Sequence, residues 1–308
     1  MTIRIPATIA AMLAASGAMA GEIAPGVEGT GYAELAYDFD SNAYDELRLE
    51  GDFDISIGPD ALNMGAPIGI DFGIDGVWID TFDSKVIYAA VSYEMAGFGK
   101  VSAGIPRSAF DSYVRSQQGA TVGQSGSLAE LAFGSANFFY AAALDDNPVG
   151  VRLDGEAGAL SFAASFSRIS DLSANTIALG AAFDTGQFRV EGAFENLYDN
   201  SIDFTNLKLG ASMDTGVFAM GASYADRDEL AFVGASARAV EIYGIFRPTE
   251  QIDVSASYVD VHHVFGDAYS TTLAAKYRFT PNFYGEATVT DYSQWASNLW
   301  QIAAGWQF

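Results

Sequence analysis

The feature that most constrains this chain is an alternation of apolar and polar residues at a period of two. It is clearest over residues 46–57, where one face would carry Leu47, Leu49, Gly51, Phe53, Ile55 and Ile57 and the other Glu46, Arg48, Glu50, Asp52, Asp54 and Ser56. Successive side chains of a β-strand point to opposite faces, so this spacing predicts strands with one apolar and one hydrophilic face. The same pattern recurs at 68–74, 87–93, 160–166, 188–194, 207–213, 218–224, 240–246, 252–258, 273–279 and 300–308.

The composition of the apolar faces indicates what they contact. Half of the residues are hydrophobic, yet no run of about 18 apolar residues follows residue 20. The apolar faces are rich in alanine and glycine beside aromatic residues, whereas large side chains dominate the dry core of a soluble β-sandwich. We therefore expect these faces to contact lipid and the chain to be an all-β transmembrane protein.

The first 20 residues are predicted to be a secretory signal peptide. One charged residue, Arg4, precedes an apolar stretch that ends in Ala18-Met19-Ala20, a cleavage site of the small-x-small type. A transmembrane anchor is the alternative, but the apolar stretch is short and nothing downstream resembles a stop-transfer segment. Residues 21–308 then form a single domain, because no linker or low-complexity tract divides them.

Short and long connections alternate along this domain. Tight turns are predicted at 96–99, 155–158, 184–186, 214–216, 248–250 and 280–282, and longer polar stretches lie at 168–174, 196–203, 225–237, 262–269 and 292–297. Lipid offers no partner to an unpaired backbone amide, so a sheet that spans it has to close on itself. We therefore predict an antiparallel β-barrel of about sixteen strands, with the short turns at the periplasmic end and a lumen wide enough for water.

The mature chain is strongly acidic. Removal of residues 1–20 takes away one of the 15 lysines and arginines and none of the 39 acidic residues, so the formal charge is 14 − 39 = −25. Such a charge repels nucleic acid and attracts cations. We expect no nucleic-acid partner and a mild preference for cations in any channel that the barrel forms.

The longest interruption of the strand pattern covers residues 107–147. It contains Arg107, Asp111, Arg115 and Glu130, and it has an apolar part at 128–144. Connections of this length are usually functional or disordered. One interpretation is a loop that folds into the lumen as a constriction, with its apolar half on the wall or at a subunit contact. The alternative is an exposed loop with an extra pair of strands near 133–143.

Short motifs flank this interruption on both sides. They are Phe98-Gly99-Lys100-Val101, Gly104-Ile105-Pro106 and Phe110-Asp111 before it, and Asp146-Asn147-Pro148-Val149 and Gly158-Ala159-Leu160-Ser161-Phe162 after it. Their order and spacing resemble the segment around the third loop of the general bacterial porins, and the resemblance spans essentially the whole mature chain. It implies a sixteen-stranded barrel in the bacterial outer membrane, a homotrimer, a third loop folded in as an eyelet, and passive diffusion of small hydrophilic solutes and ions.

In that family the eyelet sets acidic residues of the loop against arginines on the wall, and the field between them sorts solutes. In this chain Arg107 and Arg115 stand beside Asp111 and Glu130 in the predicted loop, so the separation of sign is less clean. The basic residues that strand parity places on the hydrophilic faces are Arg48, Arg152, Arg189, Lys276 and Arg278. The alternative for each of them is that it only solvates the lumen or pairs with a neighbouring carboxylate.

Aromatic residues gather near the predicted strand ends, where interfacial girdles are expected. They are Tyr37, Phe39, Trp78, Tyr93, Phe98, Tyr224, Phe283, Tyr284, Trp300 and Trp306. The last residues, Trp306 and Phe308, close an alternating strand and resemble the assembly signal of outer-membrane proteins.

No cofactor or resident metal is expected. His262 and His263, the two histidines, would point to opposite faces of a strand and make a poor metal pair. Residues 38–42 begin like a calcium loop, but Ala43 stands where glycine is needed, so we expect only adventitious binding of divalent cations there. The predicted function is that of a non-enzymatic channel. The alternatives are a substrate-selective channel with an internal binding site and, less favoured, an outer-membrane hydrolase.

Overall fold

The computed structural model describes residues 21–40, 45–63, 65–79, 82–117, 133–144, 147–171, 173–199, 203–228, 236–263, 266–294 and 298–307. The predicted signal peptide, Glu130 of the predicted loop and the terminal Phe308 lie outside these residues.

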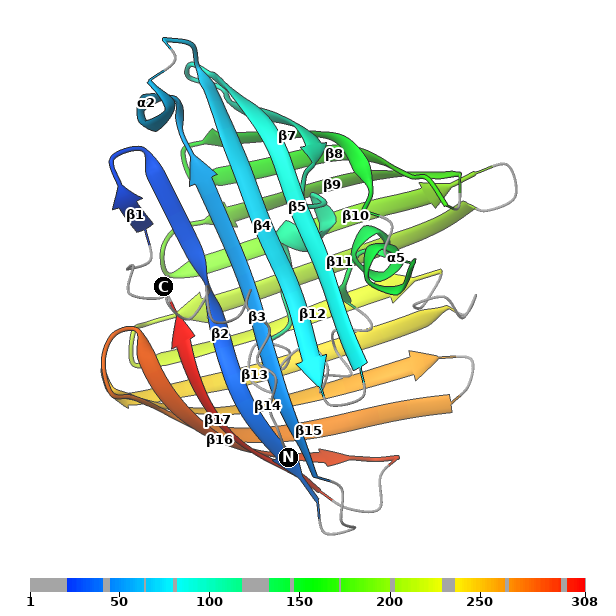
Figure 1. Cartoon of the computed structure of the whole chain (residues 1–308). Helices are drawn as coiled ribbons and strands as arrows, with labels where there is room; N and C mark the ends of the chain where they lie inside the picture. Colours follow the sequence, from blue (N-terminus) through cyan, green and yellow to red (C-terminus); the bar gives the residue numbers. More distant parts are fainter. Residues whose placement is uncertain are drawn as a thin grey trace.

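The described residues form one closed antiparallel barrel (Figure 1). Strands β2 to β17 pair each with the next, and β17 pairs with β2 through Trp300↔Phe39 to Gln307↔Tyr32, which closes a ring of sixteen strands. Their bounds are β2 (Val27–Phe39), β3 (Asp45–Ile57), β4 (Ile68–Ile79), β5 (Phe82–Met95), β6 (Gly99–Ile105), β7 (Val149–Ala157), β8 (Leu160–Ile169), β9 (Ala174–Asp184), β10 (Phe188–Tyr198), β11 (Asp203–Asp214), β12 (Phe218–Arg227), β13 (Ala237–Thr249), β14 (Ile252–His263), β15 (Gly266–Arg278), β16 (Phe283–Tyr292) and β17 (Leu299–Gln307). The predicted antiparallel barrel of about sixteen strands is confirmed.

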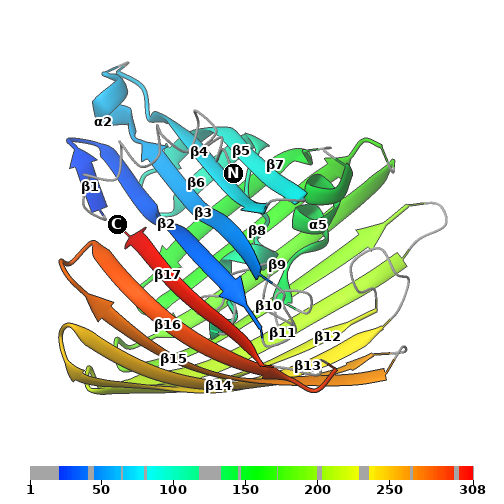
Figure 2. The same ribbon diagram turned by 60° about the horizontal axis from the view of Figure 1, so that its bottom comes forward.

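Two small elements lie at the end of the barrel that carries the short turns. A four-residue strand, β1 (Gly21–Ala24), pairs with the start of β2, and a single helical turn, α2 (Pro59–Leu62), follows β3. Figure 2 shows β1, α2 and the end of β17 together at this end. The first and the last strand of the ring, β2 and β17, therefore start and finish on the same side of the barrel, as an even number of antiparallel strands requires.

An aspartate-threonine-glycine sequence shapes two of the tight turns. In the turns at 184–186 and 214–216 the glycine has a φ of +83° and +84°, a left-handed conformation that glycine adopts without steric cost. The aspartate Oδ1 accepts a hydrogen bond from the glycine N–H at 2.6 and 2.7 Å. The threonine Oγ1 accepts one from the N–H of Phe188 and Phe218 at 3.1 Å in both turns. The side chains thus satisfy the turn amides locally.

The polar stretch 262–269, predicted as a long loop, is mostly strand. β14 runs to His263 and β15 begins at Gly266, with His262 paired to Asp267. The prediction was wrong because a paired strand satisfies its backbone whatever its side chains are. The polar residues at the end of β14 and the start of β15 therefore belong to paired strands.

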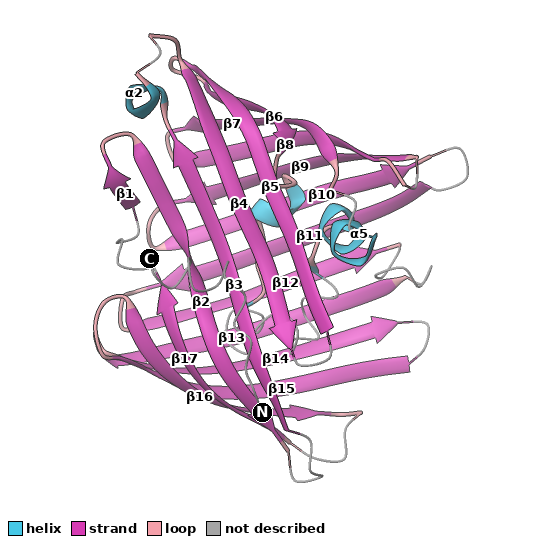
Figure 3. Cartoon of the chain, in the orientation of Figure 1, coloured by secondary structure: helices cyan, strands magenta, loops and turns pink. Residues whose placement is uncertain are grey.

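The barrel wall has a step between β5 and β6, because β6 is much shorter than β5. β6 pairs only with the Ala89–Met95 half of β5, and beyond it the N–H of Ile87 donates to Oδ1 of Asn147 at 3.4 Å. The connection between β6 and β7 contains a short helix, η1 (Phe110–Ser112), and a longer one, α5 (Ala136–Leu144), which lies beside β5 (Figure 3). The extra pair of strands considered near 133–143 is therefore wrong, because this apolar run is helical. In the described part of the chain, no helix is long and apolar enough to cross a membrane.

Aromatic rings cover glycines on neighbouring strands of the wall. A Cβ at Gly305 would lie 2.3 Å from the Oη of Tyr284, and one at Gly221 would lie 2.6 Å from the Oη of Tyr243. Over Gly305, the Tyr284 hydroxyl donates to Oε2 of Glu34 at 2.7 Å. Tyr284 was predicted to belong to an interfacial girdle, but it is 3% exposed on the inner face of the wall, so that prediction was wrong.

We expect Gly305→Ala to destabilise the barrel by about 1–3 kcal/mol, the usual cost of forcing extra atoms into a packed site. The new methyl group would displace the Tyr284 ring and break its hydrogen bond to Glu34. The change in the free energy of unfolding is measured by unfolding the protein in detergent. The folded fraction is read from gel electrophoresis, in which folded and heat-unfolded protein differ in mobility. The matched control is Gly244→Ala, where nothing lies within 4 Å of the added Cβ. Equal stability of the two variants would contradict the proposed role of the glycine.

Candidate functional site

The inner face of the ring carries most of the charged residues of the described strands. Large apolar side chains such as Leu35, Val91 and Leu209 are exposed on the other face, as contact with lipid requires. The charged residues that share the inner face include Glu34, Asp38, Arg48, Glu50, Asp52, Asp54, Asp71, Asp75, Lys100, Arg152, Asp154, Glu191, Glu195, Lys208, Arg227, Glu241, Lys276 and Glu286. This face is the candidate site, because it lines the interior of the barrel.

Arg107, the first residue of the predicted loop, is held by carboxylates of the wall. Its guanidinium lies 2.6 Å from Oδ1 of Asp52, 3.3 Å from Oδ2 of Asp54 and 3.6 Å from Oδ2 of Asp75. It also lies over the ring of Tyr88, 4.4 Å from the centroid. Burial disfavours its charged form, but Tyr88 and the three carboxylates favour it, and the pKa of Arg107 lies well above its ordinary value.

Arg152 of β7 also joins the wall to the start of the loop. Here the arginine belongs to the wall and donates to oxygen atoms of the loop. Its Nε and NH2 groups donate to the carboxylate of Asp154, at 2.9 and 2.5 Å. Its NH1 group donates to the carbonyl oxygens of Arg107 and Ser108 at 2.9 and 3.2 Å and to Oγ of Ser112 at 2.8 Å. The start of the loop is thus clamped by one arginine of its own and one of the wall.

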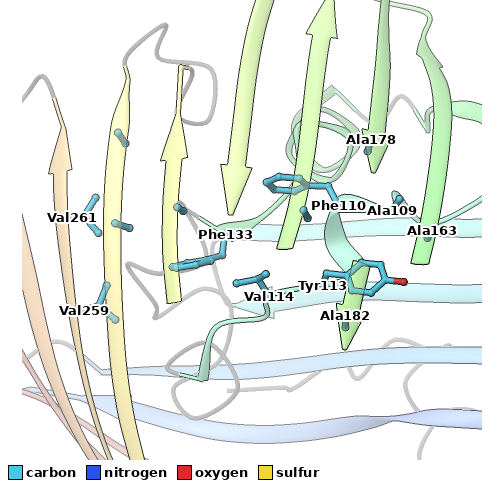
Figure 4. Close-up of a cluster of buried hydrophobic side chains, with 14 residues drawn as sticks. Ala109, Phe110, Tyr113, Val114, Phe133, Ala163, Ala178, Ala182, Val259 and Val261 are labelled. Carbon is cyan, nitrogen blue, oxygen red and sulfur yellow. The ribbon is translucent and has the colours of Figure 1, made fainter. Parts of the chain in front are cut away.

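Apolar side chains of the loop pack on a part of the wall made of small residues. Figure 4 shows Phe110, Val114 and Phe133 among alanines that project from β8 and β9 and the valines of β14. The ring of Tyr113 covers Gly180, whose Cβ would lie 2.2 Å from the ring. Short side chains leave room for the loop against the inner face, which explains why alanine alternates so regularly in these strands.

Further along, the loop bonds to charged residues on the strands β10 to β13. Glu241 accepts hydrogen bonds from the Oγ of Ser116 and the N–H of Gln117, both at 3.2 Å. The backbone near residues 133–136 is bound by three wall residues: Glu195 accepts from the N–H of Ala136 at 2.9 Å, Lys208 donates to the carbonyl of Phe133 at 2.9 Å, and Arg227 donates to the carbonyl of Gly134. Sequence reasoning missed Glu195, Lys208, Arg227 and Glu241 as binding residues. Their inward parity among alanines and serines was the signal that could have found them.

Asp111, one of the two acidic residues predicted for the loop, makes its hydrogen bonds within the loop. Asp111 accepts hydrogen bonds from the N–H and Oγ of Ser135 at 2.9 and 2.6 Å, so it joins the two described parts of the loop. Arg115 is exposed. The resemblance implied acidic residues on the loop and arginines on the wall. At the start of the loop the charges are reversed, because Arg107 of the loop lies against carboxylates of the wall.

The remaining predicted wall residues are each paired with acidic neighbours. Arg48 is buried, 3.7 Å from Asp38 and 3.7 Å from Glu50. The other pairs are Arg189 with Asp184 at 3.2 Å and Glu191 at 2.9 Å, Lys276 with Glu286 at 2.8 Å, and Arg278 with Asp253 at 2.5 Å. The charges of these basic side chains are therefore largely neutralised by the neighbouring carboxylates.

Trp306 and His262, two further residues from the sequence analysis, contact neighbouring side chains. The ring of Trp306 lies 5.4 Å from that of Phe283. His262 is exposed and lies 2.9 Å from Asp267 through Nδ1. Within the described ranges, no three histidine or carboxylate side chains are grouped to hold a metal ion; the predicted acidic loop at 38–42 falls partly outside those ranges.

Comparisons with known proteins agree with this geometry. A family model described as Gram-negative porin matches residues 7–294. No curated protein matches the chain. Among solved structures, a double variant of the Rh. blastica porin superposes with a TM-score of 0.67 at 16% identity, covering 92% of this chain and 100% of that one. A triple mutant of the Rhodopseudomonas blastica porin gives 0.66 at 17% identity with the same coverage.

The solved structures, at this low identity, show the shared barrel fold, and the family model covers most of the sequence. The chain belongs to the Gram-negative porin family and is a non-enzymatic, multi-pass β-barrel channel protein of the bacterial outer membrane.

Proposed function

We propose that the barrel is a general-diffusion porin, a water-filled channel through which small hydrophilic solutes and ions pass passively. The observation that carries this proposal is the charged inner face of a closed ring of sixteen strands. Side chains cannot fill a barrel of that size, so its interior holds water. No chemical step is needed, because the concentration gradient drives the solute.

We further propose that residues 107–147 narrow this channel. The described parts of the loop bond to Asp52 and Asp75 on β3 and β4 and to Glu195 and Glu241 on β10 and β13. These strands lie on opposite parts of a sixteen-membered ring. Between these anchors, the described part of the loop packs on the inner face of β8 and β9 and so takes up space inside the ring, which supports the interpretation of a constriction.

The excess of carboxylates supports a mild preference for cations. Arg107, Arg152, Lys276 and Arg278 are all paired with acidic side chains of the lumen. Paired basic groups contribute little net field, so the remaining carboxylates and the mature charge of 14 − 39 = −25 set the sign of the potential.

The trimer implied by the resemblance remains part of the proposal, together with export by the signal peptide and adventitious binding of divalent cations at acidic loops. Exposed apolar side chains on the outer face of β4 and β5 support a subunit contact. They include Ile70, Phe72, Val91 and Tyr93. A threefold cyclic contact through this face would bury them.

The first test is the conductance of the purified mature protein in a planar bilayer under a salt gradient. We expect large current steps in groups of three and a reversal potential of the sign that cations produce. A folded protein without conductance would refute the diffusion channel, single steps would refute the trimer, and an anion-selective potential would refute the role of the carboxylates.

The clamp at the start of the loop gives a second prediction. Arg107→Ala leaves Asp52, Asp54 and Asp75 facing one another, and loss of one partner of a largely buried ion pair costs about 3–5 kcal/mol. We expect larger current fluctuations and stronger cation selectivity in single-channel recordings. Arg168→Ala is the control, because it removes the same charge from an exposed side chain of β8 on the outward face. If the two variants behave alike, Arg107 does not hold the loop.

A further inference from the structure

A recess opens on the inner face of the wall beside the start of the loop. It has a volume of about 440 Å³ and is lined by residues of six consecutive strands, β2 to β7, and by Pro106, Arg107, Ser112 and Arg115 of the loop. We call it the loop-root recess. Its volume falls in the range of about 300–1,000 Å³ that is usual for small-molecule sites. It lies in the half of the lumen nearest the short turns, because its lining includes the start of β2 and the end of β3.

The charge of the loop-root recess differs from that of the whole chain. Its basic residues are Lys100, Arg107, Arg115 and Arg152, four of the 14 in residues 21–308, since one of the 15 in the chain is Arg4. Its acidic residues are Glu28, Asp54, Asp71 and Asp154, four of 39. A chain with a large negative excess thus lines this one recess with equal numbers of both signs.

Six of these eight charges are already used within the wall. Lys100 pairs with Asp71 at 2.8 Å, Arg152 with Asp154 at 2.5 Å, and Arg107 with Asp54 at 3.3 Å. Among the described residues, Arg115 and Glu28 are the two charged lining residues that have no ion pair, and both are exposed. The recess therefore offers one unpaired cation and one unpaired anion to whatever enters it.

We propose that the loop-root recess binds small zwitterionic solutes of the amino-acid class. The guanidinium of Arg115 takes the carboxylate of the solute, which suits the planar fork of an arginine, and the carboxylate of Glu28 takes its ammonium group. Asp54, whose side chain keeps 44% of its surface exposed beside Arg107, adds a second acceptor on the acidic side. This inference deepens the proposed function and rests on it, since a solute reaches the recess only through an open lumen.

The test records single-channel current of the full mature protein while glycine is added, with glycolamide as a neutral probe of similar size. We expect glycine to reduce the current saturably and glycolamide to reduce it only in proportion to its concentration. In Arg115→Ala and in Glu28→Gln the half-saturating glycine concentration should rise about threefold, the factor for losing one partly exposed ion pair. Arg238→Ala removes the same charge from a 70% exposed side chain of β13 and should leave the glycine response unchanged.

The outcomes separate this inference from the proposed function. A channel that conducts in plain salt but shows no saturable effect of glycine refutes the recess and leaves the porin intact. Equal saturation by glycolamide, or an unchanged response in both recess variants, also refutes it, because the binding would then not depend on these charges. Absence of conductance in plain salt refutes the diffusion channel itself. Both substituted side chains are exposed, and the plain-salt conductance of each variant shows that it has folded.

Discussion

The rest of the structure depends on the requirement that every backbone amide inside lipid has a hydrogen-bond partner within the protein. The pairing of β17 with β2 meets this requirement by closing the ring, and it brings the first and the last strand of the ring together. Once the ring is closed, strand parity sorts every side chain to lipid or to water. The alternation of apolar and polar residues at 46–57 follows from this sorting of side chains to lipid and to water.

The interior is organised by charge pairs and the outside by apolar contact. The loop is bound at its start by Arg107 and Arg152 and further along by Glu195, Lys208, Arg227 and Glu241. Between these points it packs on alanines and valines of the wall. Charged wall residues that bind backbone groups hold a segment without requiring a particular loop sequence, since carbonyl and N–H groups are present in every residue.

The sequence predicted the barrel well because lipid imposes one rule on every strand. It predicted the loop's position along the chain but not what the loop binds. Arg107 meets Asp52 across 55 residues of chain, and parity says which face a residue occupies without saying what packs on it. The run at 133–143 was ambiguous because a short apolar stretch suits a helix or a strand equally, and only its packing against Val86 and Tyr88 decides.

The partial pairing of β5 with β6 gives the returning end of the loop a structural role in the wall. Among the described residues, no strand pairs with the Phe82–Tyr88 part of β5 on its β6 side, and Oδ1 of Asn147 in the returning chain accepts a hydrogen bond from the N–H of Ile87 there. The returning end of the loop is therefore also a component of the wall. Cutting it out to make a wider pore would leave a free strand edge in the barrel, which invites pairing with other chains and aggregation. An engineered pore based on this chain would have to keep the returning segment and shorten the loop from its middle.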